Sequence, residues 1–165
     1  MHTKDRALPD AGTTRRRLYW FFGQLVTVHV TGEESGGRFS FVEFLMPPGH
    51  MTPLHAHVRD SQTVYVLDGE LTIWLPGRSY ALGPGECLYQ AAGVPHTERV
   101  TSSYGARVLD INAPAGFDAF VVAAGEPASE AALPPPALQE PDLERLAALA
   151  SEHEIELLGP PGELP

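Results

Sequence analysis

Short apolar segments separated by glycine and proline organise the chain from residue 19 to residue 112. The connecting sequences, such as TGEESGG, MPPGH and AAGVPH, are rich in residues that favour turns. About five to eight short strands, with a turn every ~10 residues, predict an antiparallel β-sandwich or β-barrel. No helical period competes with this pattern before residue 116. The predicted strands lie within 19–30, 39–46, 63–69, 70–77, 86–91, 96–100 and 106–112.

The pattern changes after the last of these strands. The segment GFDAFVVAAG at 116–125 predicts a short helix that ends at Gly125. The segment DLERLAALASEH at 142–153 predicts a second helix, with Asp142 as its N-cap. Between them, residues 126–141 are rich in proline and predict an extended arm.

We therefore predict an all-β fold with short C-terminal helices, as one barrel domain over residues 18–125. An N-terminal arm over 1–17 precedes it, and a C-terminal arm over 126–165 follows it. The C-terminal arm is too short for a second domain, so it either covers the barrel or a partner subunit, or closes the site as a lid. The chain has 165 residues and is 43% apolar, which suffices for one hydrophobic core.

Charge and cysteine content exclude several classes of protein. The net charge of −10 lacks the basic patches that bind nucleic acid or an anionic membrane, so we expect neither partner. No apolar run of about 18 residues predicts a membrane-spanning helix. The single cysteine, Cys87, cannot form an internal disulfide, which suits a cytoplasmic location, and its place in a predicted strand favours burial.

Histidines provide the strongest sign of chemistry. His55 and His57 stand two positions apart in a predicted strand, so their imidazoles point to the same face. His96 follows the turn at 83–85 and the sequence AAGVP, so a hairpin in a closed sheet can return it beside the first pair. Three imidazoles that converge in this way are a candidate metal site.

The spacing of these histidines and of neighbouring glycines resembles the two signature motifs of the cupin superfamily. The first motif reads Gly49, five residues, His55-x-His57, four residues, Gln62, six residues, Gly69. The second reads Gly85, five residues, Ala91-x-Gly93, two residues, His96. The chain departs from the family at Gln62, where glutamate is usual, at Ala91, where proline is usual, and at Val100, where asparagine is usual.

Within the superfamily the chain looks most like the small quercetin dioxygenase-like cupins, through GQLVTVHVTGEES, VEFLMPPG, GFDAFV and the C-terminal ERLAALASEHEIELLGPP. The resemblance implies a jelly-roll β-barrel around one divalent metal ion, which can be Fe, Mn, Ni, Co or Cu. It implies His55, His57, His96 and the position of Gln62 as ligands. Such enzymes bring dioxygen to a small aromatic or enolic substrate.

Gln62 changes what this site is expected to do. An amide oxygen is a weaker ligand than a carboxylate, although three histidines alone can hold a divalent ion. A glutamine also cannot take a proton near neutral pH, so a base has to come from another residue, or the substrate has to arrive already ionised. Glu98 is the candidate base if residues 96, 98 and 100 share the inner face of a strand. The alternative is a position at the rim, paired with Arg99 or Arg107.

We expect His50 and Asp60 to be solvated turn residues, with a role at the cavity mouth as the alternative.

Three functions remain open on these grounds. The first is a metal-dependent oxygenase that acts on a small apolar or aromatic substrate with dioxygen, in which Gln62 and Glu98 are the candidate catalytic residues. The second is a non-oxidative isomerase, cyclase or decarboxylase, and the third is a binding protein without catalysis.

Aromatic side chains, among them Tyr65 and Tyr89, are expected in the core. The apolar segment at 18–22 predicts a homodimer, or else serves as an edge strand of its own chain.

Overall fold

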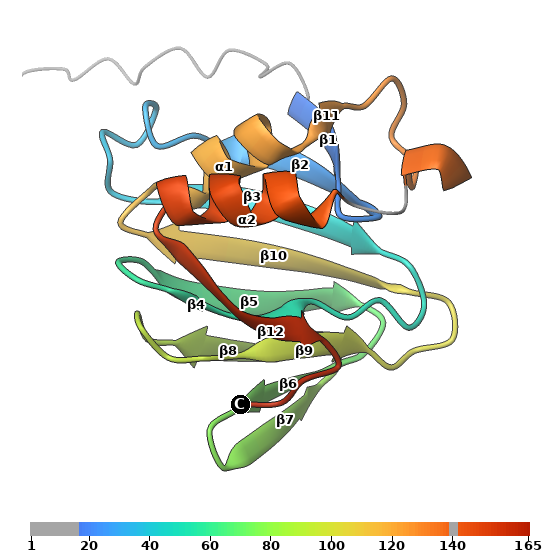
Figure 1. Ribbon diagram of the computed structural model, residues 1–165. Helices are drawn as coiled ribbons and strands as arrows, with labels where there is room; N and C mark the ends of the chain where they lie inside the picture. The colour runs from blue at the N-terminus through green and yellow to red at the C-terminus, as the bar shows by residue number, and fades with distance from the viewer. Residues whose placement is uncertain (1–16, 139–141) are drawn as a thin grey trace, which may run out of the picture.

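The strands form one large antiparallel sheet and two small ones, as the computed structural model of residues 17–138 and 142–165 shows (Figure 1). The large sheet has the strand order β11-β1-β2-β3-β10-β5-β8, and the small sheets are β12-β4 and β7-β6-β9. An isolated bridge between His55 and His96 joins the two small sheets. The architecture is the predicted antiparallel jelly-roll.

The elements have the following bounds. The strands are β1 (Arg17–Phe21), β2 (Gln24–Val30), β3 (Ser40–Met46), β4 (Pro53–His57), β5 (Ser61–Asp68), β6 (Leu71–Leu75), β7 (Arg78–Leu82), β8 (Cys87–Gln90), β9 (Thr97–Val100), β10 (Ala106–Ala113), β11 (Glu126–Pro127) and β12 (Ile155–Pro161). The helices are α1 (Phe117–Ala124), a short 3-10 helix (Pro136–Leu138) and α2 (Leu143–Glu152).

The core follows from alternation along the central strands. In β3 every second side chain is buried, including Val42, Phe44 and Met46, and β10 alternates in the same way. Val108 of β10 lies opposite Phe44, so the inner faces of the two strands meet in register. The inward positions of β10 continue from these apolar residues to two polar ones, Asp110 and Asn112. The same alternation that builds the core therefore carries polar groups into the barrel.

Several strands differ from the sequence prediction. The segment 19–30 is two strands, because Phe22 and Gly23 turn the chain with positive φ angles of 55° and 73°. The sequence RSYAL, expected to be a connection, is β7. Among the described residues it pairs with β6 alone, and Leu82 is its one buried side chain, so its sequence shows no clear apolar pattern. The sequence at 155–161 is β12, which pairs antiparallel with β4.

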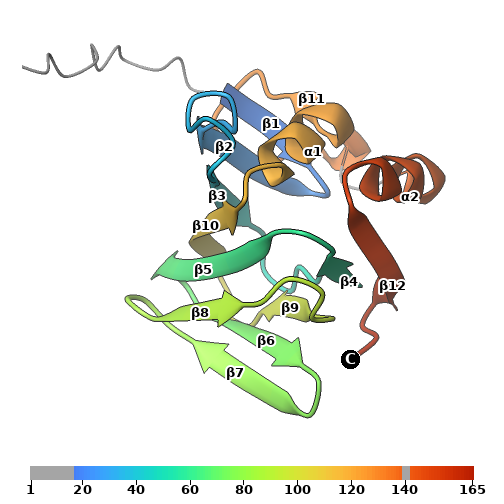
Figure 2. The same ribbon diagram turned by 90° about the vertical axis from the view of Figure 1, so that its left-hand side faces the viewer.

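Both predicted helices are confirmed. The amide of Gly125 at the end of α1 donates to the Val121 carbonyl at 2.9 Å. The Asp142 side chain caps α2 by accepting hydrogen bonds from the amides of Glu144 and Arg145. α1 and α2 contact each other on one side of the molecule, and β12 leads back from α2 towards the small sheets (Figures 1 and 2). The C-terminal segment thus returns to the strand that carries His55 and His57.

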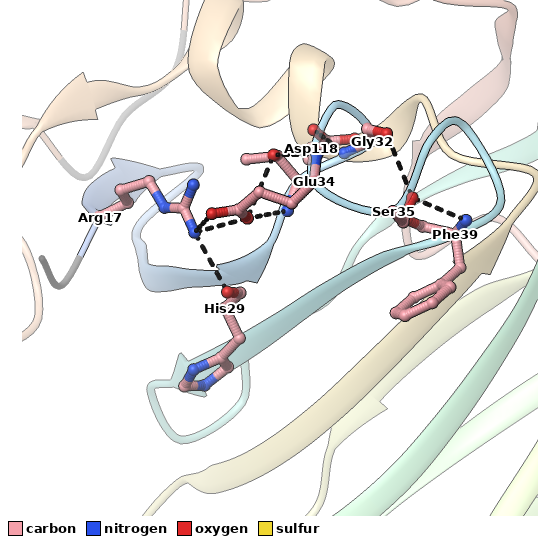
Figure 3. Close-up of polar contacts among 8 residues, drawn as sticks. Arg17, His29, Gly32, Glu34, Ser35, Phe39 and Asp118 are labelled. Carbon is pink, nitrogen blue, oxygen red and sulfur yellow. Dashed lines mark hydrogen bonds and ion pairs between the residues drawn. The ribbon is translucent and has the colours of Figure 1, made fainter. Parts of the chain in front are cut away.

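A polar network fixes the other end of α1. Asp118, which is buried, accepts a hydrogen bond from the Gly32 amide at 2.9 Å and so ties α1 to the turn after β2 (Figure 3). In the same network Arg17 donates to the Glu34 carboxylate at 2.9 Å, which lowers the pKa of Glu34 to about 2 (Figure 3). Neither Asp118 nor Glu34 lines the large cavity described below.

Several side chains expected inside lie on the outer surface. Cys87 is exposed, and so are Tyr65 and Tyr89, because β8 pairs with β5 in a register that turns these positions outward. The segment 18–22 is half-buried, and β1 pairs with both β2 and β11 of its own chain. The homodimer stays a prediction. Among the residues that the structure describes, no helix is long and apolar enough to cross a membrane.

Candidate metal centre

Three histidines from two neighbouring strands meet inside the barrel. His55 and His57 lie on β4, and His96 immediately precedes β9. Reciprocal backbone hydrogen bonds of 3.0 Å and 2.8 Å hold His55 opposite His96. The potential ligand nitrogens of the three rings all lie within 4.8 Å of one another. The predicted convergence of the three imidazoles is therefore confirmed.

Each ring is oriented through its Nδ1 atom. Nδ1 of His55 lies 2.8 Å from the Pro53 carbonyl, and Nδ1 of His96 lies 2.9 Å from the Val94 carbonyl. A carbonyl only accepts, so in these two residues Nδ1 carries the proton and the neutral ring presents a bare Nε2 lone pair. Nε2 of His57 is buried and has no hydrogen-bond partner in the described part of the chain. Such a set of nitrogens fits a divalent transition-metal ion, which would supply the missing partner.

The electrostatic environment keeps His55 and His96 neutral. Burial lowers the pKa of His55 well below its ordinary value, and the neighbouring imidazoles of His96 and His57 lower it further. Burial also lowers the pKa of His96 to about 4. Neutral imidazole is the form that ligates a metal, so these two ligands do not have to lose protons before binding at neutral pH.

Asp60 is part of this site and not a solvated turn residue, so the sequence expectation was wrong. Its Oδ2 atom lies 2.8 Å from Nδ1 of His57 and accepts a hydrogen bond of 3.0 Å from the Asn112 side chain. Burial raises the pKa of Asp60, but the hydrogen bond and charge of His57 outweigh it and the net pKa is lowered. A carboxylate behind a ligating histidine fixes the ring and strengthens it as a donor.

Gln62 lies between the histidines and a buried acid. Its Oε1 atom is 2.9 Å from Nε2 of His96, and its Nε2 atom is 2.6 Å from Oδ2 of Asp110. Burial raises the pKa of Asp110 well above its ordinary value, while the hydrogen bond from Gln62 opposes that rise. Sequence reasoning missed Asp110, although its alternation with Val108 in β10 was a signal that it points inward.

The histidines line a cavity of about 250 Å³ whose wall is mostly apolar. Glu98 also lines the cavity, so the structure places it at the inner position and not in an ion pair at the rim. Arg107, one of its candidate rim partners, instead pairs with Glu43. Burial raises the pKa of Glu98 to about 7. The cavity is lined by Phe21, Phe22, Gln24, Phe44, His50, Met51, Thr52, Pro53, His55, His57, Gln62, Val64, His96, Glu98, Val108, Asp110, Phe117, Phe120, Leu143, Leu146, Ile155, Leu157 and Pro161.

The C-terminal segment forms one wall of this cavity. Leu146 of α2 is buried against it, and Ile155 and Leu157 of β12 line it beside β4. His50, expected in a solvated turn, also lines the cavity, and burial lowers its pKa to about 4. An apolar wall with a few polar groups at one place suits a small, largely apolar molecule that is fixed by its polar end.

Metal-free protein is expected to lose stability as the pH rises above the ordinary pKa of glutamate. Because the pKa of Glu98 is raised from 4.5 to about 7, the folded state keeps a proton that the unfolded state has released. The free energy of unfolding therefore falls between these pH values, by up to about 3 kcal/mol. Denaturant unfolding of wild type and Glu98→Gln across this range measures the effect. The variant should show a flatter dependence, and equal slopes would contradict the assignment.

Sequence comparisons agree with the fold and the histidine cluster. The family described as "Cupin domain" matches residues 42–112. This matched region includes His55, His57 and His96 and so contains the whole cluster. Quercetin 2,3-dioxygenase from Bacillus subtilis (strain 168) is 31% identical over 140 residues, which cover 85% of this chain and 41% of the enzyme. The chain thus spans about two fifths of that relative.

Solved structures support the same fold. An RmlC-like cupin from Shewanella frigidimarina superposes with a TM-score of 0.54 at 22% identity, covering 63% of this chain and 88% of that one. KdgF from Halomonas sp. superposes with a TM-score of 0.53 at 21% identity, covering 59% and 85%. The fold is thus similar to that of solved cupins, and the segment that matches the cupin model carries a histidine cluster of the kind that binds metal. In sequence, the chain is similar to a quercetin 2,3-dioxygenase.

Proposed function

We propose that this protein is a metal-dependent oxygenase of the quercetin dioxygenase type, acting on a small aromatic or enolisable substrate. The observation that carries the proposal is the convergence of three imidazoles on the wall of a mostly apolar cavity. The 31% identity to a quercetin 2,3-dioxygenase supports the choice of chemistry. His55, His57 and His96 would hold the metal, with Gln62 as a weaker fourth ligand through Oε1.

A bound divalent metal would supply Lewis acidity and a place where an enolate and dioxygen come together. The protein's own residues do the rest. The apolar wall, which includes Phe44, Phe117 and Leu157, would hold the flat part of the substrate and exclude water. Glu98 would accept the proton of the substrate hydroxyl, the step that Gln62 cannot perform.

Glu98 suits this role because of where it lies. Its side chain lines the same cavity as the three histidines, two residues after His96, so a substrate that fills this cavity can reach its carboxylate. The apolar surroundings that raise its pKa to about 7 also make it a stronger base than an exposed glutamate. Orientation by the cavity and proton removal by Glu98 would together generate the reactive enolate.

A second candidate is a non-oxidative enzyme, such as an isomerase, a cyclase or a decarboxylase. The observation that favours it is a pair of carboxyl groups in the cavity, the half-buried Glu98 and the buried Asp110, beside a site that lacks the usual glutamate. Acid–base chemistry on an enolate needs such groups and does not need dioxygen.

Oxygen uptake separates these candidates. Metal-loaded protein is expected to consume dioxygen in proportion to substrate when it is given flavonols and enolisable diketones in an oxygen-electrode assay. Turnover of the same compounds without oxygen uptake would contradict the oxygenase and favour the non-oxidative enzyme. Ligand binding of equal affinity in metal-loaded and metal-free protein, without turnover, would contradict both and favour a binding protein.

A further inference from the structure

An amide and a carboxyl group form a short hydrogen bond directly behind the three histidines. Gln62 on β5 and Asp110 on β10 lie on neighbouring strands and point into the barrel, two positions apart in register. The Gln62 amide nitrogen donates to Oδ2 of Asp110 at 2.6 Å. Both residues are buried, with 7% of Gln62 and 1% of Asp110 exposed, so no bulk solvent competes for this bond.

We propose that Asp110 is a positioning residue that turns the Gln62 amide so that Oε1 faces the metal. The inference rests on the metal centre of the proposed function. It adds a residue that orients the glutamine so that the glutamine can act as a ligand. A glutamine side chain has an oxygen that can bind a cation and a nitrogen that cannot, and the two are close in size. Asp110 offers the nitrogen an acceptor, so the oxygen is left on the side of His96.

The contact on the other side of Gln62 points to the same arrangement. Nδ1 of His96 donates to the Val94 carbonyl, so Nε2 of a neutral His96 carries a lone pair. Oε1 of Gln62 lies 2.9 Å from that nitrogen, which brings two acceptors together. Two acceptors are stable at this separation when a cation binds both, which is the geometry of neighbouring ligands of one metal ion.

The role does not depend on the charge of Asp110. Its Oδ1 atom is buried and has no hydrogen-bond partner among the described residues, so a proton can reside there. Oδ2 then still accepts from the Gln62 amide, because a protonated carboxyl group keeps an acceptor oxygen. What Asp110 contributes is an acceptor at a fixed place.

The pairing also explains why glutamine stands at position 62. A glutamate there would face the Asp110 carboxyl at the distance of a short hydrogen bond, so two carboxylates would repel unless one took up a proton. Asp60 and Asn112 are arranged in a similar way, because Asp60 orients His57 and accepts a hydrogen bond from Asn112. Asp110 and Asn112, both on the inner face of β10, thus hold residues that orient or form the candidate metal ligands.

Metal affinity in a double-mutant cycle tests the inference. Titration of metal-stripped protein with Co²⁺ or Ni²⁺ by calorimetry gives the dissociation constant of each variant. Asp110→Leu is expected to weaken binding by about 10–100-fold, the usual effect of losing an outer partner of a ligand. Asp110→Asn keeps an acceptor oxygen and should stay within about threefold of wild type. In a Gln62→Leu background, Asp110→Leu should have no further effect.

A second test uses the effect of Asp110→Asn on metal affinity, which should become favourable when position 62 is glutamate. This test does not need the Asp110→Leu variant to fold. In a Gln62→Glu background, Asp110→Asn replaces a repelling carboxyl group by an amide donor. It should therefore tighten metal binding by about tenfold relative to Gln62→Glu alone. Asp118→Leu is the matched control for the loss of a buried acid, since Asp118 bonds to the Gly32 amide outside the cavity (Figure 3). It should leave metal affinity unchanged.

Metal-free protein provides a readout of the hydrogen bond itself. In ¹H–¹⁵N spectra, the side-chain amide of Gln62 should give a downfield, slowly exchanging signal that Asp110→Leu removes and Asp110→Asn retains. Equal weakening by Asp110→Leu in the wild-type and Gln62→Leu backgrounds would overturn the role of Asp110 while the metal centre stands. Wild type that shows the amide signal and binds no metal would instead overturn the metal centre, and the positioning role with it.

Discussion

His57→Ala is expected to remove high-affinity metal binding. The substitution deletes one of three ligands. Loss of a residue that only hydrogen-bonds to a ligand typically weakens metal binding by about 10–100-fold. Loss of the ligand itself should therefore raise the dissociation constant for Co²⁺ or Ni²⁺ by more than about 100-fold. Wild type at a free metal concentration of ~100 times its dissociation constant should gain about 3 kcal/mol of stability, and the variant should gain none. Calorimetric titration and thermal unfolding with and without metal measure both effects.

The comparison has to be made against each protein's own metal-free form. Without His57, the buried Asp60 carboxylate loses one of its hydrogen bonds, so metal-free His57→Ala should be less stable by about 1–3 kcal/mol. His29→Ala is the matched control, because His29 is half-exposed and pairs with Glu43 outside the cavity. A His57→Ala protein that still binds metal within about tenfold of the control would contradict the three-histidine centre.

Glu98→Gln is expected to reduce turnover by about 10²–10⁴-fold, the usual contribution of a general base, without a loss of bound metal. The amide keeps the size and polarity of the carboxyl group but cannot accept the substrate proton. Wild-type activity should rise as the pH is raised through the pKa of Glu98, because the base works in its ionised form. The variant should lose that part of the pH profile. Steady-state rates, together with metal content, measure both outcomes.

Glu43→Gln is the control for Glu98→Gln. Glu43 is a partly buried glutamate on the outside of the barrel, held by Arg107 and His29, and it does not line the cavity. Its replacement should leave the rate and the pH profile unchanged. If Glu98→Gln behaves like this control, the base is a different group or the substrate arrives already ionised.

The sequence was sufficient to predict most strands and the histidine cluster because both depend on short-range spacing. Residues two apart in a strand share a face, and His55 and His57 needed no further information. The return of His96 to β4 also followed from turn residues between two strands. Strand β7 was missed because an edge strand with a single buried residue shows no apolar pattern.

The outer layer of the site could not be predicted with the same ease. Asp60 follows His57 in a loop, and acids in loops are usually solvated, so its burial depends on the partner Asn112 from a distant strand. Asp110 meets Gln62 through the pairing of β10 with β5, across a separation of 48 positions in the chain. Such contacts depend on strand order and register, and a single sequence carries only the alternation that places each residue on a face.

For the C-terminal segment, too, local structure could be predicted from the sequence but long-range pairing could not. Its helix and N-cap followed from local signals, since Asp142 precedes a run with leucines at helical spacing. The strand after it was not predicted, and neither was its pairing with β4, which makes Ile155 and Leu157 part of the cavity wall. The sequence therefore indicated a covering segment but not the surface that it covers.

The metal content of the purified protein tests the central claim most directly. Protein isolated without added metal or chelator should contain close to one equivalent of Fe, Mn, Ni, Co or Cu by plasma mass spectrometry. That result would show that three histidines with Gln62 form a working centre. Protein that is empty, and stays empty after incubation with each of these metals, would contradict the metal centre and the oxygenase built on it.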